Sequence, residues 1–335
     1  REFFNFEVKE LDFSQEKDCE KRIREYFVRD NMLAFDLEQG PLLRVSIIKM
    51  PNRYVFYYNM HHIISDGWSI EVLLKDFMAY YESHISGIEV TLPKLQIQYK
   101  DYSAWQLKEL LSASSAVHRA YWLDSLSGEL PLLNFPSHQL RPKIKTYKGN
   151  RLRTCLSSSQ TSNLKRFSQE SGGSLFMGLL AVWNVLCYRY TGLEDIIIGS
   201  PVAGRDHPDI ENQIGCYVNT LALRNRVNSE EDFNMFFDRL KDRTLNAYSH
   251  QMYPFDRLVA ELDLHRDISR STVFDVMLTL QNIGENSRGR LISDEEANKI
   301  YDISGEISKF DMNLTFREEG DYLSFEITYN SDIYN

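Results

Sequence analysis

The sequence predicts an α/β protein with two lobes, each of which combines strands and helices. In the first half, the aromatic-rich run 54–60 leads into an amphipathic helical pattern that continues to residue 81. In the second half, a helical pattern over 174–191 is followed by the β-branched run 196–198. Because strand and helix patterns occur together in both halves, each half is expected to fold as a mixed unit.

The boundary between the lobes is expected within residues 112–150. Pro131, Pro136 and Pro142 interrupt this stretch, which shows no sustained periodicity. We therefore predict an N-terminal lobe of residues 1–130 and a C-terminal lobe of residues 131–335.

Local patterns in the first lobe predict strands alternating with helices. In order, they are a strand within 3–11, a helix within 15–33, strands over 42–50 and 54–60, a helix after residue 67 and a helix over 99–111. Turn residues 51–53 favour a hairpin between the two central strands. Ser69 is expected to cap the helix that follows. The histidine pair at 61–62 therefore lies on a strand-to-helix turn.

The second lobe begins with a helix over 174–191 that is apolar nearly all round, as a buried helix is, with Gly192 as its C-cap. The run 196–198 predicts a strand buried on both faces. The remaining elements are a helix over 233–248, a long loop over 281–309, and a hairpin formed by 310–316 and 323–329.

Composition and charge exclude several classes of function. The formal net charge is −10 and Lys and Arg are scattered, so neither a nucleic acid nor an anionic membrane surface is an expected partner. The apolar run 175–190 is too short and too polar to span a bilayer. The four cysteines form no CxxC pair, which argues against zinc and disulfides and fits the reducing cytosol.

The segment 61–67, HHIISDG, is the main candidate for chemistry. Adjacent residues on a strand point to opposite faces, so His61 and His62 are not expected to share one metal ion or one substrate. Asp66 and Gly67 are expected to tighten the turn, with glycine allowing a backbone geometry that other residues resist. Two interpretations stay open at this level: a presented functional histidine, or two structural histidines in an ordinary turn.

Competing catalytic motifs leave little trace in the sequence. It contains no G-x-S-x-G elbow, Walker loop, G-x-G-x-x-G or H-E-x-x-H. Residues 162–165 match S-x-x-K, a pattern of common residues with little specificity. No motif nominates a cysteine as a nucleophile, and Cys216 is expected to pack as a small hydrophobic residue.

Residues 61–69, HHIISDGWS, resemble the core motif of nonribosomal peptide synthetase condensation domains, in which the second histidine is the functional one. Further segments resemble other motifs of that family, in its order and approximate spacing: 35–44, 99–105, 199–205, 214–221, 250–255 and 266–271. The family's opening motif has no counterpart here, and its domain continues past Asn335. Together with a start at Arg1 rather than methionine, this indicates a piece of a longer protein that lacks both ends of the domain.

The resemblance implies two chloramphenicol-acetyltransferase-like lobes in a V-shaped pseudo-dimer, with His62 in a central tunnel. It implies peptide-bond formation, in which the amine of one carrier-bound aminoacyl thioester attacks the thioester carbonyl of another. The expected partners are donor and acceptor peptidyl carrier proteins and a neighbouring adenylation domain, in a cytoplasmic pathway of secondary metabolism such as antibiotic or siderophore biosynthesis. Phosphopantetheine belongs to the carriers, so the domain itself is expected to bind no cofactor and no metal.

The resemblance also assigns roles to individual residues. His62 is expected to act as a general base or to hold the amine in line, and Gly67 to admit substrate and bind the oxyanion through its N–H. His61 and Asp66 are expected to support the site, with Arg205 as the partner of Asp66 across the lobes. Residues expected beside the substrate in the tunnel are Trp68, Ser69 and Asn219.

Several alternatives remain beside amide formation. An epimerisation domain shares HHxxxDG, although residues 68–73 are more similar to condensation domains. Heterocyclisation is disfavoured because that class replaces both histidines with an aspartate pattern. A stand-alone acyltransferase and an inactive docking platform complete the set; retention of His62, Asp66 and Gly67 argues against the platform.

Overall fold

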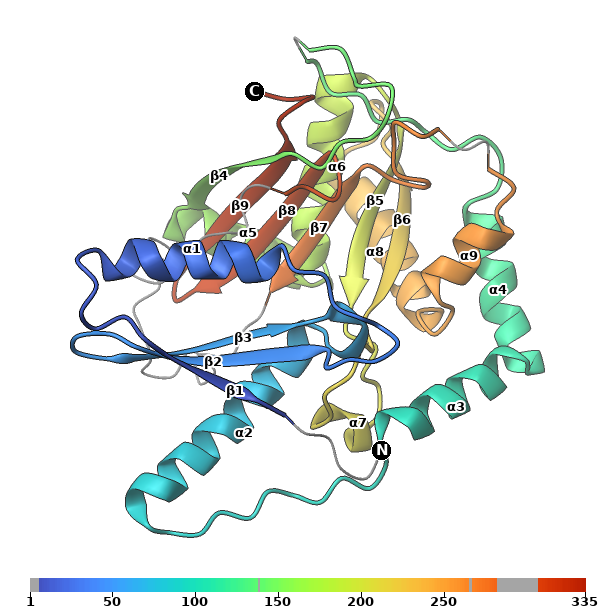
Figure 1. The fold of residues 1–335 in the computed structure, drawn as a ribbon. Helices are drawn as coiled ribbons and strands as arrows, with labels where there is room; N and C mark the ends of the chain where they lie inside the picture. Colours follow the sequence, from blue (N-terminus) through green and yellow to red (C-terminus); the bar gives the residue numbers. More distant parts are fainter. Residues whose placement is uncertain (1–5, 138, 265–266, 282–306) are drawn as a thin grey trace. The chain divides into compact units, whose positions relative to one another are not determined.

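The computed structural model describes residues 6–137, 139–264, 267–281 and 307–335 (Figure 1). Contacts group these into two compact units. The first contains the described residues of 1–99 together with 205–217, and the second those of 100–204, 218–283 and 305–335. The segment 205–217 thus belongs with the first unit, which no sequence pattern indicated. The lobes 1–130 and 131–335 stay a prediction.

The first unit is built on a three-stranded sheet in the order β1 (Val8–Asp12), β2 (Leu43–Lys49), β3 (Tyr54–Met60). β1 runs parallel to β2, whereas β2 and β3 are antiparallel, so the predicted hairpin is confirmed. Helices α1 (Cys19–Asn31) and α2 (Gly67–Ser86) cover opposite faces of this sheet (Figure 1).

Strand alternation explains why β3 packs against both helices. Val55 belongs to the core cluster formed with Ile23 and Phe27 of α1. Its neighbour Phe56 points to the other face and stacks on Phe77 of α2, with ring centroids 4.2 Å apart. The strand and the helix on either side of the histidine pair, β3 and α2, are therefore both anchored in packed layers.

The second unit contains a six-stranded mixed sheet. Its order is β4 (Gly149–Leu156), β9 (Tyr322–Asn330), β8 (Met312–Glu319), β7 (Val276–Gln281), β5 (Asp195–Val202), β6 (Asn219–Arg226). Helices α5 (Ser158–Glu170), α6 (Leu175–Thr191) and α8 (Phe233–Ser249) pack together over one face (Figure 1). The short helices α7 (Pro208–Glu211) and α9 (Phe255–Glu261) belong to the first and second unit, respectively.

Most predicted elements of the second half are confirmed. Ile196 and Ile198 have no exposed surface and Ile197 is 3% exposed, as expected of a strand buried on both faces. α6 ends at Gly192, which has a φ of 71° in the left-handed region. The terminal hairpin is β8 and β9, with Phe316 stacked on Phe325 across the pair. Most of the predicted loop 281–309 lies outside the described residues.

Residues 112–150, which show no sustained periodicity in the sequence, begin with a helix that the sequence pattern does not predict. Residues 113–125 form α4 (Ala113–Ser125), preceded by α3 (Tyr99–Leu110). The Ser112 side chain caps α4 by accepting from the Ser115 N–H, and the helix buries only one large side chain fully, Trp122 at 2% exposure. So narrow an apolar face produces weak helical periodicity, which is why the sequence does not reveal this helix.

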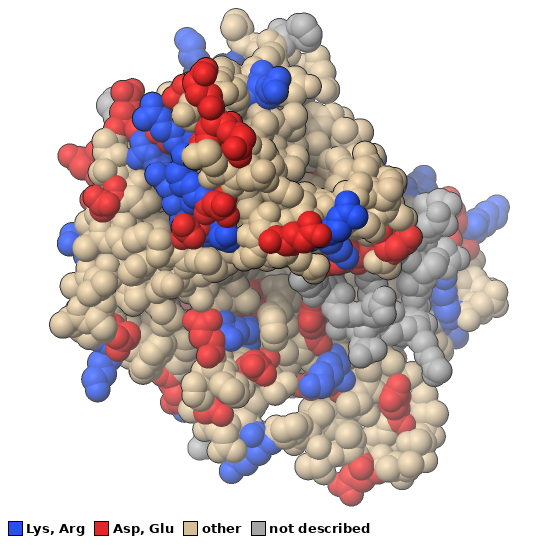
Figure 2. All heavy atoms as spheres, turned by 180° about the vertical axis from the view of Figure 1, so that it is seen from behind, with Lys and Arg blue, Asp and Glu red and all other residues tan. Residues whose placement is uncertain are grey.

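No single helix among the described residues is long and apolar enough to cross a membrane; α5 and α6 reach that length and composition only together, with a 105° bend between them. Charged side chains of both signs are interspersed on the face shown in Figure 2. The described residues on this face form no continuous basic stripe of the kind that follows a nucleic-acid backbone.

Candidate functional site

The histidine pair lies on the predicted turn between β3 and α2. His61 follows β3 in extended conformation, residues His62–Ile64 form one 3₁₀ turn (η1), and α2 begins at Gly67. The His61 side chain closes the turn, since its Nδ1 accepts a hydrogen bond from the Ile63 N–H at 3.0 Å. Side chains of the turn itself therefore set its geometry.

The two histidines have the different surroundings that were expected, although neither lies on the strand, because β3 ends at Met60. His61 is half-buried and meets the Phe35 ring edge-on at a centroid distance of 5.8 Å. His62 is exposed, and its Nδ1 lies 3.8 Å from the Cys216 Sγ. One histidine is thus held within the first unit and the other is presented at its surface.

Asp66 caps helix α2. Its Oδ1 accepts from the Ser69 N–H at 2.8 Å and from the Ser69 hydroxyl at 2.7 Å, and its Oδ2 accepts from the Tyr217 N–H at 2.9 Å. The prediction that Ser69 caps this helix is therefore wrong. The helix begins at Gly67, so Ser69 lies in its first turn and donates to the cap.

The predicted partner of Asp66 is confirmed. Arg205 Nη2 lies 3.1 Å from Asp66 Oδ1, and the two side chains are 1% and 3% exposed. Arg205 Nη1 donates to the carbonyls of Gln213 (2.8 Å) and Ile210, and the guanidinium lies 4.2 Å from the centre of the Tyr217 ring. Both residues belong to the first unit, so the pair joins two segments of that unit that are distant in sequence.

Asp66 is held in its charged form. Burial opposes ionisation, but hydrogen bonds from Ser69 and the Tyr217 N–H, together with the charge of Arg205, outweigh burial and lower the pKa of Asp66. The ion pair therefore ties segment 205–217 to the start of α2, and it does so at a carboxylate that is fully ionised near neutral pH.

Ser69 is buried, whereas Gly67 has open space beside its backbone. Ser69 has no exposed surface and lies inside the Asp66–Arg205 network, and its predicted place beside the tunnel stays a prediction. Gly67 does not have a positive φ, so the expected special backbone geometry is wrong. A Cβ built on Gly67 would meet no atom within 4 Å, which leaves open space beside its backbone.

Trp68 is 43% exposed, and its indole N–H donates to the Glu211 carbonyl at 2.8 Å. This bond gives the first turn of α2 a second attachment to segment 205–217. The role of Trp68 beside a substrate stays a prediction.

Asn219, at the start of β6, uses its whole side-chain amide within the second unit. Nδ2 donates to the carbonyls of Gln251 (2.7 Å) and Tyr253 (2.8 Å), and Oδ1 accepts from the N–H groups of Phe255 (3.0 Å) and Thr220 (2.8 Å). Because an amide has two donors and two acceptor positions, nothing is left for a substrate. Asn219 therefore holds the loop after α8, and its place beside the tunnel stays a prediction.

We expect Asn219→Ala to lower the free energy of unfolding by about 1–3 kcal/mol, because it leaves the Phe255 N–H and two carbonyls without their partners. Urea unfolding measures this loss. Amide hydrogen exchange at Phe255 should speed up more than exchange in β8, which lies elsewhere in the sheet. Equal exchange rates at Phe255 in both proteins would contradict the assignment.

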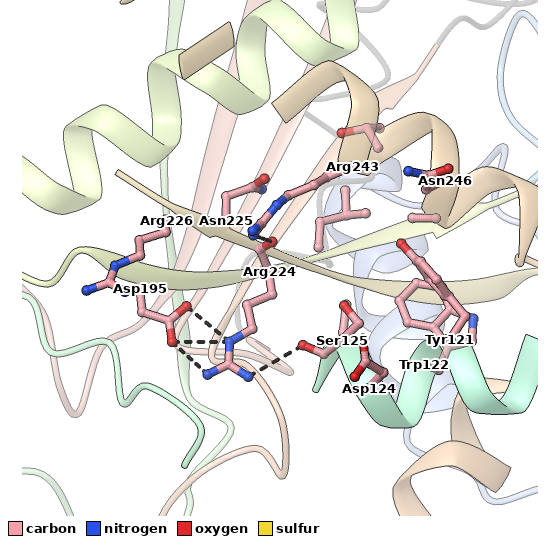
Figure 3. A pocket seen from close by; sticks show the side chains of 14 residues that line it. Tyr121, Trp122, Asp124, Ser125, Asp195, Arg224, Asn225, Arg226, Arg243 and Asn246 are labelled. Atoms are coloured by element: carbon pink, nitrogen blue, oxygen red, sulfur yellow. Dashed lines mark hydrogen bonds and ion pairs between the residues drawn. The ribbon is translucent and has the colours of Figure 1, made fainter. Parts of the chain in front are cut away.

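A separate pocket of ≈ 400 Å³ lies in the second unit between α4, α8 and the edge strand β6 (Figure 3). Arg224 points toward Asp195, with Nη2 2.7 Å from Oδ2, and also donates to the Ser127 carbonyl at 2.7 Å. Arg243 Nη1 donates to the Arg224 carbonyl at 3.1 Å. Both arginines are thus held by hydrogen bonds within the second unit.

No group of three or more His, Cys, Asp or Glu side chains in the described part of the chain is arranged to hold a metal ion. The groups that the candidate site can offer are thus an exposed imidazole at His62, the backbone N–H groups that begin α2, and a half-buried thiol at Cys216. An imidazole and oriented N–H groups can move a proton and stabilise developing negative charge. The sequence indicated the first two and did not assign Cys216 to the site.

Comparisons with known proteins bear on this arrangement. A family model described as "Condensation domain" matches residues 2–335. The chain is 41% identical over 305 residues to bacitracin synthase 2 of Bacillus licheniformis, an alignment that covers 90% of this chain and 11% of that protein. It is 39% identical over 302 residues to tyrocidine synthase 3 of Brevibacillus parabrevis, covering 90% of this chain and 4% of that protein. The chain thus spans a small part of these relatives.

Solved structures share the fold. A four-domain nonribosomal peptide synthetase bound to AMP and glycine matches with a TM-score of 0.81 and 21% identity, covering 99% of this chain and 26% of that one. The X-domain from teicoplanin biosynthesis matches with a TM-score of 0.80 and 19% identity, covering 98% of this chain and 74% of that one. At these identities the likenesses show the fold alone, and they confirm the predicted fold class.

Proposed function

Because this chain belongs to the condensation-domain family, whose members are amide-forming acyltransferases of peptide synthetases, we propose that it joins two carrier-bound acyl groups through an amide bond. The amine of an acceptor aminoacyl thioester attacks the carbonyl carbon of a donor thioester. A C–N bond forms, the C–S bond breaks, the amine loses a proton, and the donor carrier's thiol takes one up.

The observation that carries this proposal is the way in which His62 is presented. Its side chain is exposed on a turn that is closed by His61 and followed at once by the buried Asp66–Arg205 pair. A functional side chain must be accessible while its backbone stays fixed. Both conditions hold at His62, whereas His61 meets only the second.

Two roles for His62 follow from the chemistry of the reaction. An α-amino group has a pKa of about 7.7–8.0, so a useful fraction is already neutral near pH 7, and a thioester is a reactive acyl donor. A strong base is therefore not required. We propose that His62 mainly holds the amine in line with the carbonyl carbon, and that it accepts the proton as the tetrahedral intermediate forms.

Gly67 supports the same step from the backbone. It is the first residue of α2, where N–H groups lack partners within the helix and the helix dipole favours negative charge. Space beside its Cα leaves room for a reacting group to approach. We propose that the Gly67 N–H helps to bind the oxyanion of the tetrahedral intermediate.

Gly67→Ala tests this role without disturbing the fold. The new Cβ has space and Ala suits a helix, so the free energy of unfolding should stay the same or rise by up to about 1 kcal/mol. Amide formation should fall by about tenfold or more, because the methyl group occupies the space that the reacting groups need. Single-turnover kinetics with loaded carriers measure the rate. A variant that folds and reacts like the wild type would exclude the role of Gly67.

The proposed partners follow from the reaction. Donor and acceptor carrier proteins would bring their acyl groups on phosphopantetheine arms, and an adenylation domain of the same synthetase would supply activated amino acids. The sequence relatives are much longer synthases of which this chain matches one small part, which supports such a multidomain setting.

The decisive experiment incubates the protein with two carrier proteins loaded with different aminoacyl groups and follows the products by mass spectrometry. Amide formation on the acceptor carrier supports the proposal. Exchange of the α-hydrogen in D₂O without amide formation would instead identify an epimerase, and the absence of both reactions when the chain is tested within its parent protein would identify an inactive platform.

A further inference from the structure

The segment around Cys216 is attached to the same residues that anchor the His62 turn. The Gly215 N–H donates to the Ser69 hydroxyl oxygen at 3.0 Å, and the Tyr217 N–H donates to Asp66 Oδ2 at 2.9 Å. Asp66 and Ser69 form the start of α2, directly after the turn. The backbone on both sides of Cys216 is therefore hydrogen-bonded to the residues that directly follow the His62 turn.

Tyr99 holds the same backbone from a third direction. Its Oη donates to the Cys216 carbonyl at 2.9 Å, and its ring packs so closely on Gly215 that an added Cβ would lie 2.3 Å from a ring carbon. No real side chain makes such a contact, so residue 215 must be a glycine for this packing. Cys216 is thus fixed in position rather than carried on a free loop.

The Cys216 thiol meets one edge of the His62 ring. Its Sγ lies 3.8 Å from Nδ1, within the range of weak hydrogen bonds to sulfur. Within the ranges that the structure describes, the His62 imidazole forms no other hydrogen bond. Nδ1 is therefore contacted, and Nε2 is the nitrogen left for a reacting group.

We propose that Cys216 is a positioning residue of His62: its thiol holds the Nδ1 edge of the ring, biases which nitrogen carries the ring hydrogen, and leaves Nε2 for the substrate. A neutral imidazole has one N–H and one acceptor nitrogen, and the partner of one nitrogen sets the state of the other. The statement that Nε2 faces substrate rests on the proposed function. The effect of Cys216 on the tautomer and orientation of the His62 ring does not.

The thiol acts here as a neutral group. Burial and, to a smaller extent, the charge of Asp66 raise the pKa of Cys216, so the S–H form persists through the neutral pH range. A reactive nucleophile requires the thiolate, which is favoured by a lowered pKa. Cys216 is therefore suited to contact His62 and not to form an acyl-enzyme.

Nitrogen NMR of the imidazole tests the inference without any substrate. In protein labelled with ¹⁵N-histidine, His62 is assigned as the signal lost in His62→Ala. Cys216→Ala should change the Nδ1 and Nε2 chemical shifts of His62, which report the tautomer. Cys216→Ser, which replaces the thiol with a hydroxyl that can also hydrogen-bond, should stay closer to the wild type. The matched control is Cys155→Ala, which removes an exposed cysteine and should change nothing. Unchanged His62 shifts in Cys216→Ala would overturn the inference.

Kinetics with loaded carriers give the second readout. Cys216→Ala should lower kcat by roughly 2- to 10-fold, the worth of one weak hydrogen bond, with little change in KM because the thiol does not touch substrate. Cys216→Ser should recover part of the loss. If the wild type forms no amide, the proposed function fails and the NMR result still decides the role of Cys216. If the wild type is active and Cys216→Ala keeps its kcat, the positioning role fails alone.

Discussion

His62→Ala is expected to lower the rate of amide formation by about 10²–10⁴-fold while leaving the fold intact. The side chain is exposed and its only hydrogen bond among the described residues is the weak contact with Cys216, so the free energy of unfolding should change by less than about 0.5 kcal/mol. Single-turnover kinetics with two loaded carriers measure the first quantity, and urea unfolding measures the second.

Two further variants make this result specific. His84→Ala removes an exposed histidine at the other end of α2 and should react like the wild type. His62→Gln replaces the imidazole with a side-chain amide, which can hydrogen-bond but cannot serve as a base. A rate for His62→Gln well above that of His62→Ala indicates positioning, whereas equal rates for these two variants indicate proton transfer. Wild-type product formation by His62→Ala would exclude both roles.

The local geometry of the candidate site was predictable because it depends on residues close in sequence. The strand 54–60 and the helix after residue 67 each have a clear pattern, so the turn that presents His62 follows from the elements on either side. The Asp66–Arg205 pair was predictable for another reason. The resemblance placed both residues in motifs, and an aspartate that is buried requires a cation.

What the sequence did not reveal depends on distant packing. Ser69 follows an exposed tryptophan and looks accessible, but segment 205–217 covers it completely. Asn219 lies in a motif and looked free for a substrate, but its amide is used by the loop after α8. Neither periodicity nor spacing reports which backbone groups a side chain will meet. For the same reason, the sequence does not reveal that Cys216 contacts His62.

Asp66→Asn is expected to lower the free energy of unfolding by about 3–5 kcal/mol at pH 7. Asparagine has nearly the same shape, but it leaves the charge of Arg205, whose side chain is 1% exposed, without an anion. The same change should also lower amide formation, because the start of α2 and segment 205–217 lose their common anchor. The exposed pair Asp12–Lys49 provides the matched control: Asp12→Asn should change stability far less.

A double variant shows how much of the stability lost in Asp66→Asn is due to leaving the Arg205 cation without an anion. If Asp66→Asn destabilises mainly by leaving Arg205 unpaired, then Asp66→Asn combined with Arg205→Met should be more stable than Asp66→Asn alone. Recovery will be partial, because Arg205 also donates to the carbonyls of Ile210 and Gln213. Additive losses in the double variant would show that the two residues act independently.

The stability lost in Asp66→Asn should depend on pH, because the pKa of Asp66 is lowered in the folded protein. Folding favours the carboxylate, so its contribution is complete above the unfolded pKa of about 3.9 and is lost as the pH falls through the lower folded value. The difference in unfolding free energy between the wild type and Asp66→Asn should therefore stay constant from pH 7 to about pH 5 and narrow only below about pH 4. Urea unfolding of both proteins across this pH range measures the difference. Other carboxyl groups contribute equally to the two proteins, so their contributions cancel when the unfolding free energies are subtracted. A difference that narrowed on raising the pH above neutrality would mean that Asp66 is not the charged partner of Arg205.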